Sequence, residues 1–379
     1  MTHTVRHMNV THRTVVAGSG SVGSPTVRAA VVGAGFMGRV HAESVRRAGG
    51  AVVAVASSSP FTVEAAAETL GADQGYPSVE VLLSDAEIDV LHVCAPNAVH
   101  ASVTRAALAA GVHVICEKPL ATGEDDAAAL VAAAAGKIAT VPFVYRFHPM
   151  IREMRERLAA GEAGFLSTIS GGYLQDWLSE STDDDWRVDA ELGGPSRAFA
   201  DIGSHWCDLM EFVTGDRIAR LSAQTVVVHE RRDTTTEDVA TVHFTTVSGV
   251  VGTLLVSQVA AGRKNRLHIE VSGTETSFGF DQEDPERLWV GRRKGNLMLL
   301  RDPDTLSAPA ARYSRLPAGH SQGYQDCFDA FVADTYRAIR GEECADGLPT
   351  FADGLRAVRI TDAVLRSAAD GGEWTEVLP

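Results

Sequence analysis

Asp201 and His205 carry the side chains best suited to move a proton, and they stand four positions apart. The surrounding residues predict a helix over 201–212 with Asp201 near its N-cap, so both side chains lie on one helix face. A carboxylate and an imidazole at this spacing suit proton transfer at about pH 7, where histidine titrates. An N-cap aspartate beside a structural histidine would give the same pattern, so the pair alone leaves both interpretations open.

A lysine follows a predicted buried strand in the segment Glu117-Lys118-Pro119. The apolar run 112–116 predicts the strand, and the proline makes the following loop rigid. Polar groups at the carboxyl end of a parallel strand face the ligand crevice of such a sheet, so we expect Lys118 to face a cleft. Burial there would lower the pKa of the lysine, and Glu117 would raise it. An ordinary solvated lysine is the alternative.

A glycine-rich loop supplies the third group of candidates. Gly33, Gly35 and Gly38 follow an apolar run over 27–32 and open a helical pattern over 36–48. In a dinucleotide-binding loop the first glycine permits the tight turn and the second admits the pyrophosphate. The third lets helix and strand pack closely. This context predicts a nucleotide site.

The start of that helix completes the predicted phosphate site. Phe36 and Met37 lie in its first turn, where unpaired N–H groups and the positive end of the helix dipole favour an anion. A second glycine match, Gly18 to Gly23, leads into Ser24-Pro25 and opens no helix. We therefore assign it to a flexible tail over residues 1–26.

Strand-like and helix-like segments alternate in the first part of the chain. This order predicts βαβ units around a parallel sheet, with ligands at the carboxyl ends of the strands. The predicted strands span 27–32, 51–56, 88–94, 112–116 and 138–144, and the predicted helices span 36–48, 61–70, 99–110 and 124–135.

The pattern changes after residue 147 to one helix over 149–160 and then segments that alternate polar and apolar residues. Alternation predicts an antiparallel sheet with one covered face. The other face is either solvated or paired with another subunit, so we expect a homo-oligomer. The predicted strands include 218–228, 239–244, 252–259, 267–271 and 288–290, and two closing helices span 322–340 and 351–368.

The sequence does not decide the nucleotide preference. The acidic residue that usually binds the adenosine ribose is missing, because no acid stands between Ser44 and Val63. Ser57 and Ser58 end the second predicted strand, and their hydroxyls can bond a ribose hydroxyl or a 2′-phosphate. The expected cofactor is therefore NAD or NADP.

Composition excludes several classes of partner. The chain has 379 residues, 45% of them hydrophobic, which allows two domains, and its formal net charge is −15. The negative surplus disfavours nucleic acid and anionic membranes, and no apolar run approaches the length of about 18 residues that spans a membrane. The five cysteines show no metal-ligand spacing. We expect no metal site, free thiols and a cytoplasmic protein.

Together these motifs resemble one family, the glucose-fructose oxidoreductase/inositol dehydrogenase/MocA-like (Gfo/Idh/MocA) oxidoreductases. The resemblance covers about Val27 to Leu378 and rests on the glycine loop, Ala95-Pro96-Asn97, Glu117-Lys118-Pro119 and Asp201 to His205, in the family's order and spacing. It implies an N-terminal Rossmann domain over 27–146. It also implies a C-terminal α/β domain over 147–379, with a large, mostly antiparallel open sheet for substrate binding and oligomerisation.

The resemblance also implies roles for single residues. Lys118, Asp201 and His205 would form the catalytic set and contact the substrate. His205 would act as acid and base, Lys118 would bond the substrate oxygen, and Asp201 would position the substrate or Lys118. Further implied cofactor contacts are Pro96, Asn97, His100, Glu117 and Lys118.

Arg146, Trp177 and Trp186 are additional substrate candidates. Arg146 lies in a segment that resembles the family's domain junction. The two tryptophans lie among polar residues, and an indole ring can pack on the C–H face of a sugar. Core or surface packing would explain both tryptophans equally well.

The expected activity is hydride transfer between NAD or NADP and a secondary alcohol or ketone of a sugar, sugar derivative or cyclitol. Partners are then a small-molecule substrate and a second copy of the chain, as a homodimer or homotetramer. Two enzymatic alternatives are glycoside processing by transient oxidation of a sugar hydroxyl and reduction of a non-sugar carbonyl or dihydrodiol. A non-enzymatic nucleotide-binding protein would have lost the Lys118, Asp201 and His205 set, which is present here.

Overall fold

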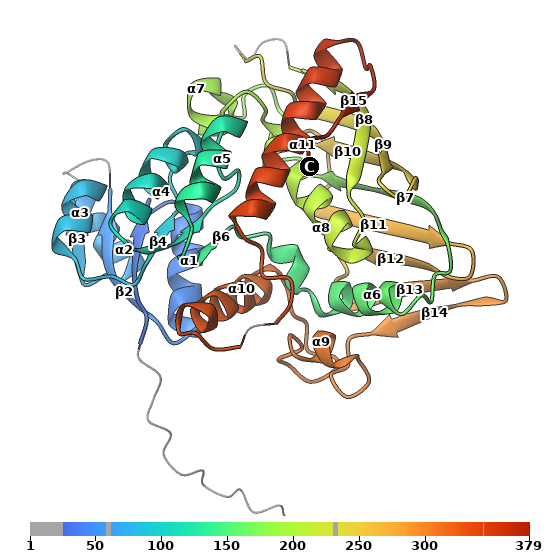
Figure 1. Cartoon of the computed structure of the whole chain (residues 1–379), viewed down its shortest axis with the longest axis horizontal. Helices are drawn as coiled ribbons and strands as arrows, with labels where there is room; N and C mark the ends of the chain where they lie inside the picture. The colour runs from blue at the N-terminus through green and yellow to red at the C-terminus, as the bar shows by residue number, and fades with distance from the viewer. Residues whose placement is uncertain (1–25, 58–61, 230–233, 344) are drawn as a thin grey trace, which may run out of the picture.

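The computed structural model describes residues 26–57, 62–229, 234–343 and 345–379. Most of the predicted tail over 1–26, the second glycine match and Ser58 lie outside these residues. Two β-sheets lie side by side, the first built from the N-terminal part of the chain and the second from the C-terminal part (Figure 1).

The first sheet has parallel strands in the order β3-β2-β1-β4-β5-β6, which confirms the predicted Rossmann arrangement. Its strands are β1 Arg28–Val32, β2 Ala51–Ala56, β3 Gln74–Tyr76, β4 Val90–Val93, β5 His113–Cys116 and β6 Ala139–Thr140. Its helices are α1 Phe36–Arg47, α2 Val63–Leu70, α3 Val79–Asp85, α4 His100–Ala109 and α5 Glu124–Ala133.

Two parts of this sheet differ from expectation. Strand β3 and helix α3 were not predicted, because a strand of three residues with a central glycine has no periodic signal. The strand predicted over 138–144 is wrong in extent, since only Ala139–Thr140 pairs. Pro142 follows, and a proline has no N–H to continue the ladder. The chain then forms a 3₁₀ turn over Val144–Phe147.

A helix from the C-terminal part completes the core of the first sheet. Helix α10, Tyr324–Ile339, lies against α1 (Figure 1), and its Phe328, Phe331 and Tyr336 are buried with residues of β1, β2 and α1. The core around the first sheet therefore extends beyond the expected boundary at residue 146.

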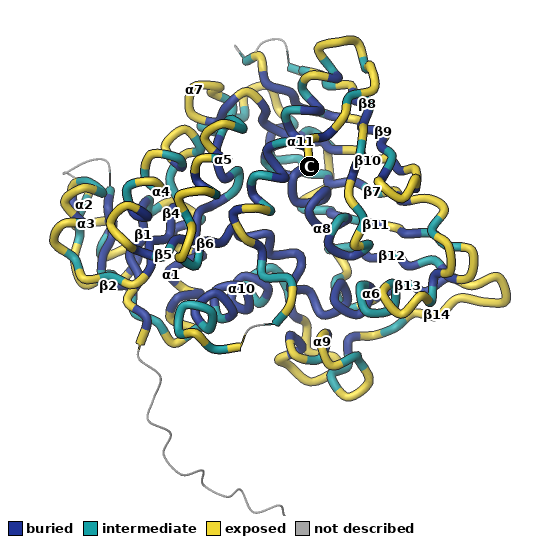
Figure 2. Tube along the Cα trace, in the orientation of Figure 1, coloured by how far each residue is buried: buried dark blue, intermediate teal, exposed yellow. Residues whose placement is uncertain are grey.

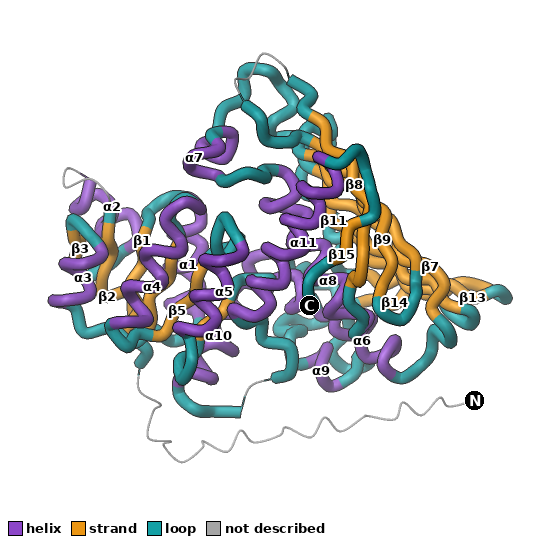
Figure 3. Tube along the Cα trace, turned by 45° about the horizontal axis from the view of Figure 1, so that its top comes forward, coloured by secondary structure: helices purple, strands orange, loops and turns teal. Residues whose placement is uncertain are grey.

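The second sheet has the order β14-β13-β12-β11-β7-β10-β9-β8-β15, and its pairs are antiparallel except for β7 with β10. Its strands are β7 Leu166–Leu174, β8 Ile218–Val226, β9 Val239–Thr246, β10 Val251–Ser257, β11 Arg266–Gly273, β12 Ser277–Asp281, β13 Arg287–Arg292, β14 Gly295–Leu300 and β15 Thr375–Glu376. Helices α6 Pro149–Ala159, α8 Ser204–Thr214 and α11 Phe351–Ala369 cover one face, and no helix of the described residues covers the other (Figure 3). Two short helices, α7 Ala190–Gly193 and α9 Ala308–Ala311, lie in connecting segments.

The predicted open, mostly antiparallel sheet is thus confirmed, but β7 was missed. Its centre is Gly171-Gly172, which weakens the strand pattern. The structure needs glycine there, because a Cβ on Gly171 would lie 2.5 Å from the indole nitrogen of buried Trp206. Close packing of β7 against helix α8 therefore explains why Gly171, a residue type that favours turns, stands within a strand.

The helix that carries the predicted acid/base pair starts earlier than expected. Phe199–Gly203 forms a π-helical turn that continues into α8, and the Asp201 N–H donates to the Arg197 carbonyl at 2.8 Å. Asp201 therefore lies in the first turn of the helical segment, near its N-terminus as predicted, and the N-cap itself is Ala198. The helix start is capped instead by the buried Glu237 carboxylate, which accepts from the N–H groups of Arg197 and Phe199 and from the Ser196 hydroxyl.

We predict that Glu237→Ala lowers the free energy of unfolding by about 1–3 kcal/mol, because it leaves these buried donors without an acceptor. Urea unfolding followed by circular dichroism measures the change. Glu270→Ala, at an exposed position of β11, is the matched control and should change stability little. Equal stability of both variants would contradict the capping role.

Candidate active site

One cavity of about 400 Å³ brings residues from both parts of the chain together. Six of the predicted site residues line it: Phe36, Met37, Glu117, Lys118, Asp201 and His205. The carboxyl end of β5 supplies Glu117 and Lys118, and the segment that starts α8 supplies Asp201 and His205. The first turn of α1 supplies the other two.

The glycine-rich loop fits a dinucleotide. Gly33 has φ +98°, and a Cβ there would lie 2.6 Å from the Cys94 carbonyl oxygen. A Cβ on Gly38 would overlap the Gly33 carbonyl oxygen, so this glycine is required for close packing. Gly35 has nothing within 4 Å of a Cβ position, and α1 begins with neither a side-chain cap nor an acidic residue in its first turn. This open, uncapped helix N-terminus can hold a pyrophosphate.

Lys118 and Asp201 form an ion pair across the cavity. The Lys118 ammonium donates to Asp201 Oδ1 at 2.5 Å and to the Asp201 carbonyl at 2.9 Å. Asp201 Oδ2 accepts from Gln258 Nε2 at 2.8 Å. Burial raises the pKa of Asp201, but Lys118 and Arg187 outweigh it and bring the pKa to about 2. The carboxylate is ionised at neutral pH, and Lys118 keeps one N–H for a ligand.

His205 is a neutral imidazole in this setting. Burial lowers its pKa, and the neighbouring Lys118 lowers it further, to about 3. The rings of Phe143 and Tyr145 contact it edge-on, with centroids at 5.7 and 5.2 Å. A neutral imidazole on the cavity wall can accept a proton.

The part of the cavity wall beside His205 is a hydrogen-bonded polar network that sequence analysis did not assign as a unit. The hydroxyls of Tyr145 and Tyr173 bond each other, and Tyr173 also donates to Asn265 Oδ1 at 2.7 Å. Gln175 Nε2 donates to the same oxygen at 2.9 Å. Tyr173 and Gln175 come from β7 and the residues after it, so the missed strand hid this wall.

Arg187 is a second residue that was missed. It lines the cavity, and its Nε lies 3.5 Å from Asp201 Oδ1, while its Nη1 donates to Asp185 at 3.1 Å. In the sequence its neighbour Trp186 stood out, because an indole ring can pack on a sugar, whereas Arg187 belonged to no motif. Arg187 therefore adds a cation to the Lys118–Asp201 pair.

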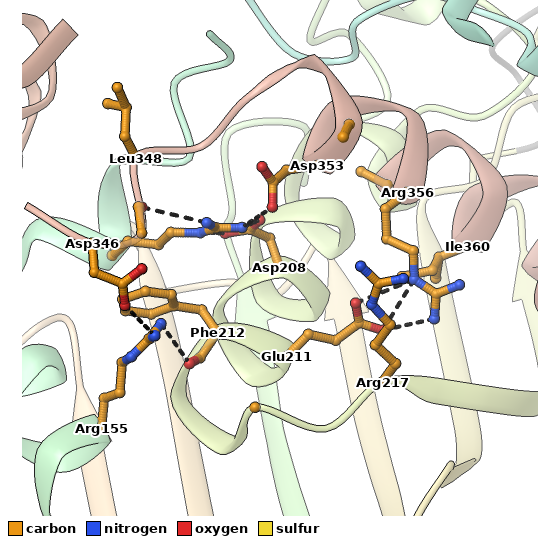
Figure 4. A pocket seen from close by; sticks show the side chains of 15 residues that line it. Arg155, Asp208, Glu211, Phe212, Arg217, Asp346, Leu348, Asp353, Arg356 and Ile360 are labelled. Atoms are coloured by element: carbon orange, nitrogen blue, oxygen red, sulfur yellow. Dashed lines mark hydrogen bonds and ion pairs between the residues drawn. The ribbon is translucent and has the colours of Figure 1, made fainter. Parts of the chain in front are cut away.

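The structure does not bring Arg146 to this cavity, which corrects its expected substrate contact. Its guanidinium is buried, bonds Asp208 through two nitrogens and donates to Asp353 at 2.8 Å. These groups line a separate cavity beside α8 and α11, where the two carboxylates face one another (Figure 4). Arg146 thus fastens α8 to α11 through paired charges.

The two tryptophans also lie outside the cavity lining. Trp177 donates to Gln175 Oε1 at 2.7 Å and so supports the polar wall from behind. Trp186 lines a neighbouring open groove, and the Arg187 guanidinium stacks on its ring at 4.4 Å. Their direct contact with substrate stays a prediction.

The predicted cofactor contacts on the loop after β4 have different placements. His100 is buried, and its ring nitrogens lie 2.8 Å from the carbonyls of Pro119 and Ala95, so it joins two loops beneath the cleft instead of contacting a ligand. Asn97 donates to the Gly193 carbonyl at 2.8 Å, and Pro96 is exposed beside it. Ser57 follows β2 and bonds the Thr62 hydroxyl at 2.8 Å.

Searches for other kinds of site gave no candidate in the described residues. No group of three or more His, Cys, Asp or Glu side chains is arranged to hold a metal ion. No described helix is both long and apolar enough to cross a membrane. The described cysteines, 94, 116, 207 and 327, are free thiols.

Two family models match the chain and cover more than half of it. The first, GFO_IDH_MocA, is described as an oxidoreductase family with an NAD-binding Rossmann fold and matches residues 27–143. The second, the GFO/IDH/MocA C-terminal domain, matches residues 151–279. The matches therefore cover all strands of the first sheet and β7 to β11 of the second.

Individual proteins are similar over nearly the whole chain. Levoglucosan dehydrogenase of Pseudarthrobacter phenanthrenivorans is 27% identical over 392 residues, which cover 92% of this chain and 97% of the relative. The solved structure of an oxidoreductase domain protein from Kribbella flavida is 32% identical, with a TM-score of 0.86 over 93% of this chain and 100% of that one. An inositol dehydrogenase homolog from Azotobacter vinelandii, complexed with NADH and myo-inositol, is 27% identical with a TM-score of 0.85, over 93% and 97%.

We predict that Gly35→Ala and Gly38→Ala fail in different ways. Gly35→Ala should keep the unfolding free energy but weaken dinucleotide binding, because its methyl group occupies the space left for the pyrophosphate. Gly38→Ala should also lower stability, because its methyl group collides with backbone of the same loop. Fluorescence titration with NADH and thermal unfolding separate the two effects. Unchanged NADH binding by Gly35→Ala would contradict the phosphate site.

Proposed function

The chain belongs to the Gfo/Idh/MocA family of oxidoreductases, and from this membership we propose that it transfers a hydride between NAD or NADP and a secondary alcohol or ketone of a sugar, sugar derivative or cyclitol. The observation that carries the proposal is the single cavity that holds Lys118, Asp201 and His205 next to the first turn of α1. Relatives named for levoglucosan and inositol support the substrate class.

His205 is the acid/base of the proposed reaction. When bound, the dinucleotide accepts or donates the hydride. As the hydride leaves the carbinol carbon, the hydroxyl proton passes to the neutral His205 imidazole and the carbon–oxygen double bond forms. In the opposite direction His205 returns the proton to the oxygen. The pKa of about 3 keeps the imidazole unprotonated at neutral pH, so its nitrogen is free to accept the proton that the substrate loses as the hydride leaves.

Lys118 binds the reacting oxygen. Two of its N–H donors hold Asp201, and the third points its positive charge at the oxygen on which negative charge develops. Asp201 acts through Lys118, since its carboxylate fixes the ammonium and is itself fixed by Gln258. The polar wall of Tyr173, Asn265 and Gln175 supplies hydroxyl and amide groups for the other hydroxyls of a polyol.

A homodimer or homotetramer through the uncovered face of the second sheet is part of the proposal. Strand register places Val226, Val251 and Leu255 on that face, and each is at least 42% exposed. Figure 2 shows exposed residues along these strands. Apolar side chains on a solvated sheet face favour contact with a second copy. Its proposed location is the cytoplasm, supported by the free described thiols.

The activity test measures reduced-nicotinamide absorbance with NAD⁺ and NADP⁺ separately against a panel of sugars, anhydrosugars and inositols. We predict signal with at least one polyol, and a Lys118→Ala variant that still binds NADH but loses about 10²–10³-fold in kcat/KM. The loss follows from removing the donor to the reacting oxygen.

Lys294→Ala is the matched control, because Lys294 is exposed in the hairpin between β13 and β14. It should turn over like the wild type. Full turnover by Lys118→Ala would refute the assigned role of Lys118. Tight NADH binding without signal from any polyol would favour the transient-oxidation or carbonyl-reduction alternatives.

For the interface, we predict that Leu255→Asp dissociates the oligomer in light scattering after size exclusion. A carboxylate at this position would have to be buried without a partner. Val247→Asp, in the exposed turn between β9 and β10, is the control and should leave the mass unchanged. A monomeric wild type would reject the interface.

A further inference from the structure

Four buried side chains, which we call the Glu117–Tyr336 chain, connect the floor of the cavity to α10. Glu117 Oε1 lies 3.0 Å from His41 Nε2, and His41 Nδ1 lies 2.8 Å from His92 Nδ1. His92 Nε2 lies 2.9 Å from the Tyr336 hydroxyl. His41, His92 and Tyr336 are 0% exposed, and Glu117 is 6% exposed.

The donors and acceptors of this chain have one self-consistent direction. Among the described residues His92 is the hydrogen-bond partner of the Tyr336 hydroxyl, so the phenol donates to His92 Nε2. The neutral His92 then carries its proton on Nδ1 and donates to His41 Nδ1. His41 in turn carries its proton on Nε2 and donates to the Glu117 carboxylate.

The reverse direction is disfavoured by the same contacts. It would require His41 to donate from Nδ1 to His92, with either a charged His41 or a protonated Glu117. His92 would then donate to Tyr336. The lowered pKa of Glu117 disfavours its protonation. The buried phenol proton would be left without an acceptor in the described part of the chain, which is costly. Burial raises the pKa of Tyr336 well above its ordinary value, so the phenol stays a donor.

We propose that His41 and His92 are positioning residues that keep the Glu117 carboxylate ionised and fixed beside Lys118 and His205. The proposal rests on the proposed function, since the groups that Glu117 adjoins are those of the proposed reaction. Glu117 lines the cavity, and its other oxygen, Oε2, accepts from the Lys118 N–H at 3.3 Å. The chain therefore orients the start of the loop that carries the reactive ammonium.

Several elements place titratable groups around Glu117, and among them His41 is the side chain that donates a hydrogen bond to its carboxylate. Burial raises the pKa of Glu117, but the hydrogen bond from His41 and the charge of Lys118 hold it below its usual value. The facing groups are His41 from α1, Lys118, His100 from α4, Arg187, His205 from α8 and Tyr324 from α10, with the Cys94 thiol.

The sign of the pH effect follows from this arrangement. A carboxylate with a lowered pKa loses its charge only as the pH falls through that low value, so wild-type activity should persist into acid solution. Without the His41 donor the pKa of Glu117 rises, and the acid limb of kcat/KM moves to higher pH.

The test compares His41→Leu with His41→Gln. We expect His41→Leu to move the acid limb up by about one pH unit and to lower kcat about tenfold, with KM within about twofold. His41→Gln should restore most of both, because its amide can donate to Glu117 and accept from His92. Phe328→Leu is the packing control: its ring lies 4.7 Å from His41, and its loss should lower stability without moving the acid limb.

A second measurement reads the chain without any assay of turnover. ¹⁵N NMR of histidine-labelled protein should show His92 protonated at Nδ1 and His41 protonated at Nε2, both neutral at pH 7. Tyr336→Phe removes one hydroxyl from the far end and should change the signals of both rings. If His41→Leu does not fold, Tyr336→Phe serves as the test variant in its place, and we expect it to move the acid limb of kcat/KM in the same direction.

Three outcomes overturn the proposal. A doubly protonated His41 in the wild type contradicts the direction of the chain. An unchanged pH profile in folded His41→Leu or Tyr336→Phe, or equal losses in His41→Leu and His41→Gln, assigns these residues to packing alone. A different result tests the function: if the wild type shows no turnover but both tautomers are as expected, the proposed function is rejected, whereas the Glu117–Tyr336 chain is confirmed.

Discussion

The ion pair between Lys118 and Asp201 is the contact on which the site depends, because its partners come from different parts of the chain. Lys118 follows strand β5 of the first sheet, and Asp201 precedes α8, which lies on the second sheet. Removing two charges from water is costly, and attraction alone repays that cost poorly. Here Gln258, Arg187 and the Asp201 carbonyl add further polar contacts, so both charges are satisfied.

Each partner of this ion pair is held in place by hydrogen bonds from residues that lie far away in the sequence. On one side the Glu117–Tyr336 chain links the loop after β5 to α10, a helix that lies far along the sequence but belongs to the core of the first sheet. On the other side the Glu237 carboxylate, from the residues before β9, caps the turn that presents Asp201. Close distances in the site therefore follow from contacts between segments 38 or more residues apart.

The local signals explain what could be predicted from sequence. Most strands of the first sheet are short apolar runs. Gly33, Gly35 and Gly38 stand between one such strand and a helix, so the Rossmann fold and its glycine-rich loop could be predicted from the sequence. The cap of the Asp201 turn, the wall that contains Tyr173 and the pairing of His41 with His92 were not. Each depends on a partner from another element. For Tyr173 the strand pattern itself was weakened by Gly171 and Gly172, of which Gly171 leaves room for the Trp206 indole.

The balance of charge in the cavity explains why a buried imidazole can serve as a base. Glu117 and Asp201 bring two negative charges, and Lys118 and Arg187 bring two positive ones, so these four groups around the neutral His205 carry no net charge. Lys264, also on the lining, is paired with Asp176. Burial and Lys118 oppose protonation of His205, whereas Glu117 and Asp201 favour it. In the proposed reaction the imidazole takes a proton from the substrate, Lys118 stabilises the negative charge that develops on the reacting oxygen, and the two carboxylates stabilise the imidazolium. Glu117 is held by a neutral hydrogen-bond chain and not by a second buried cation. Its negative charge therefore remains available to stabilise the His205 imidazolium.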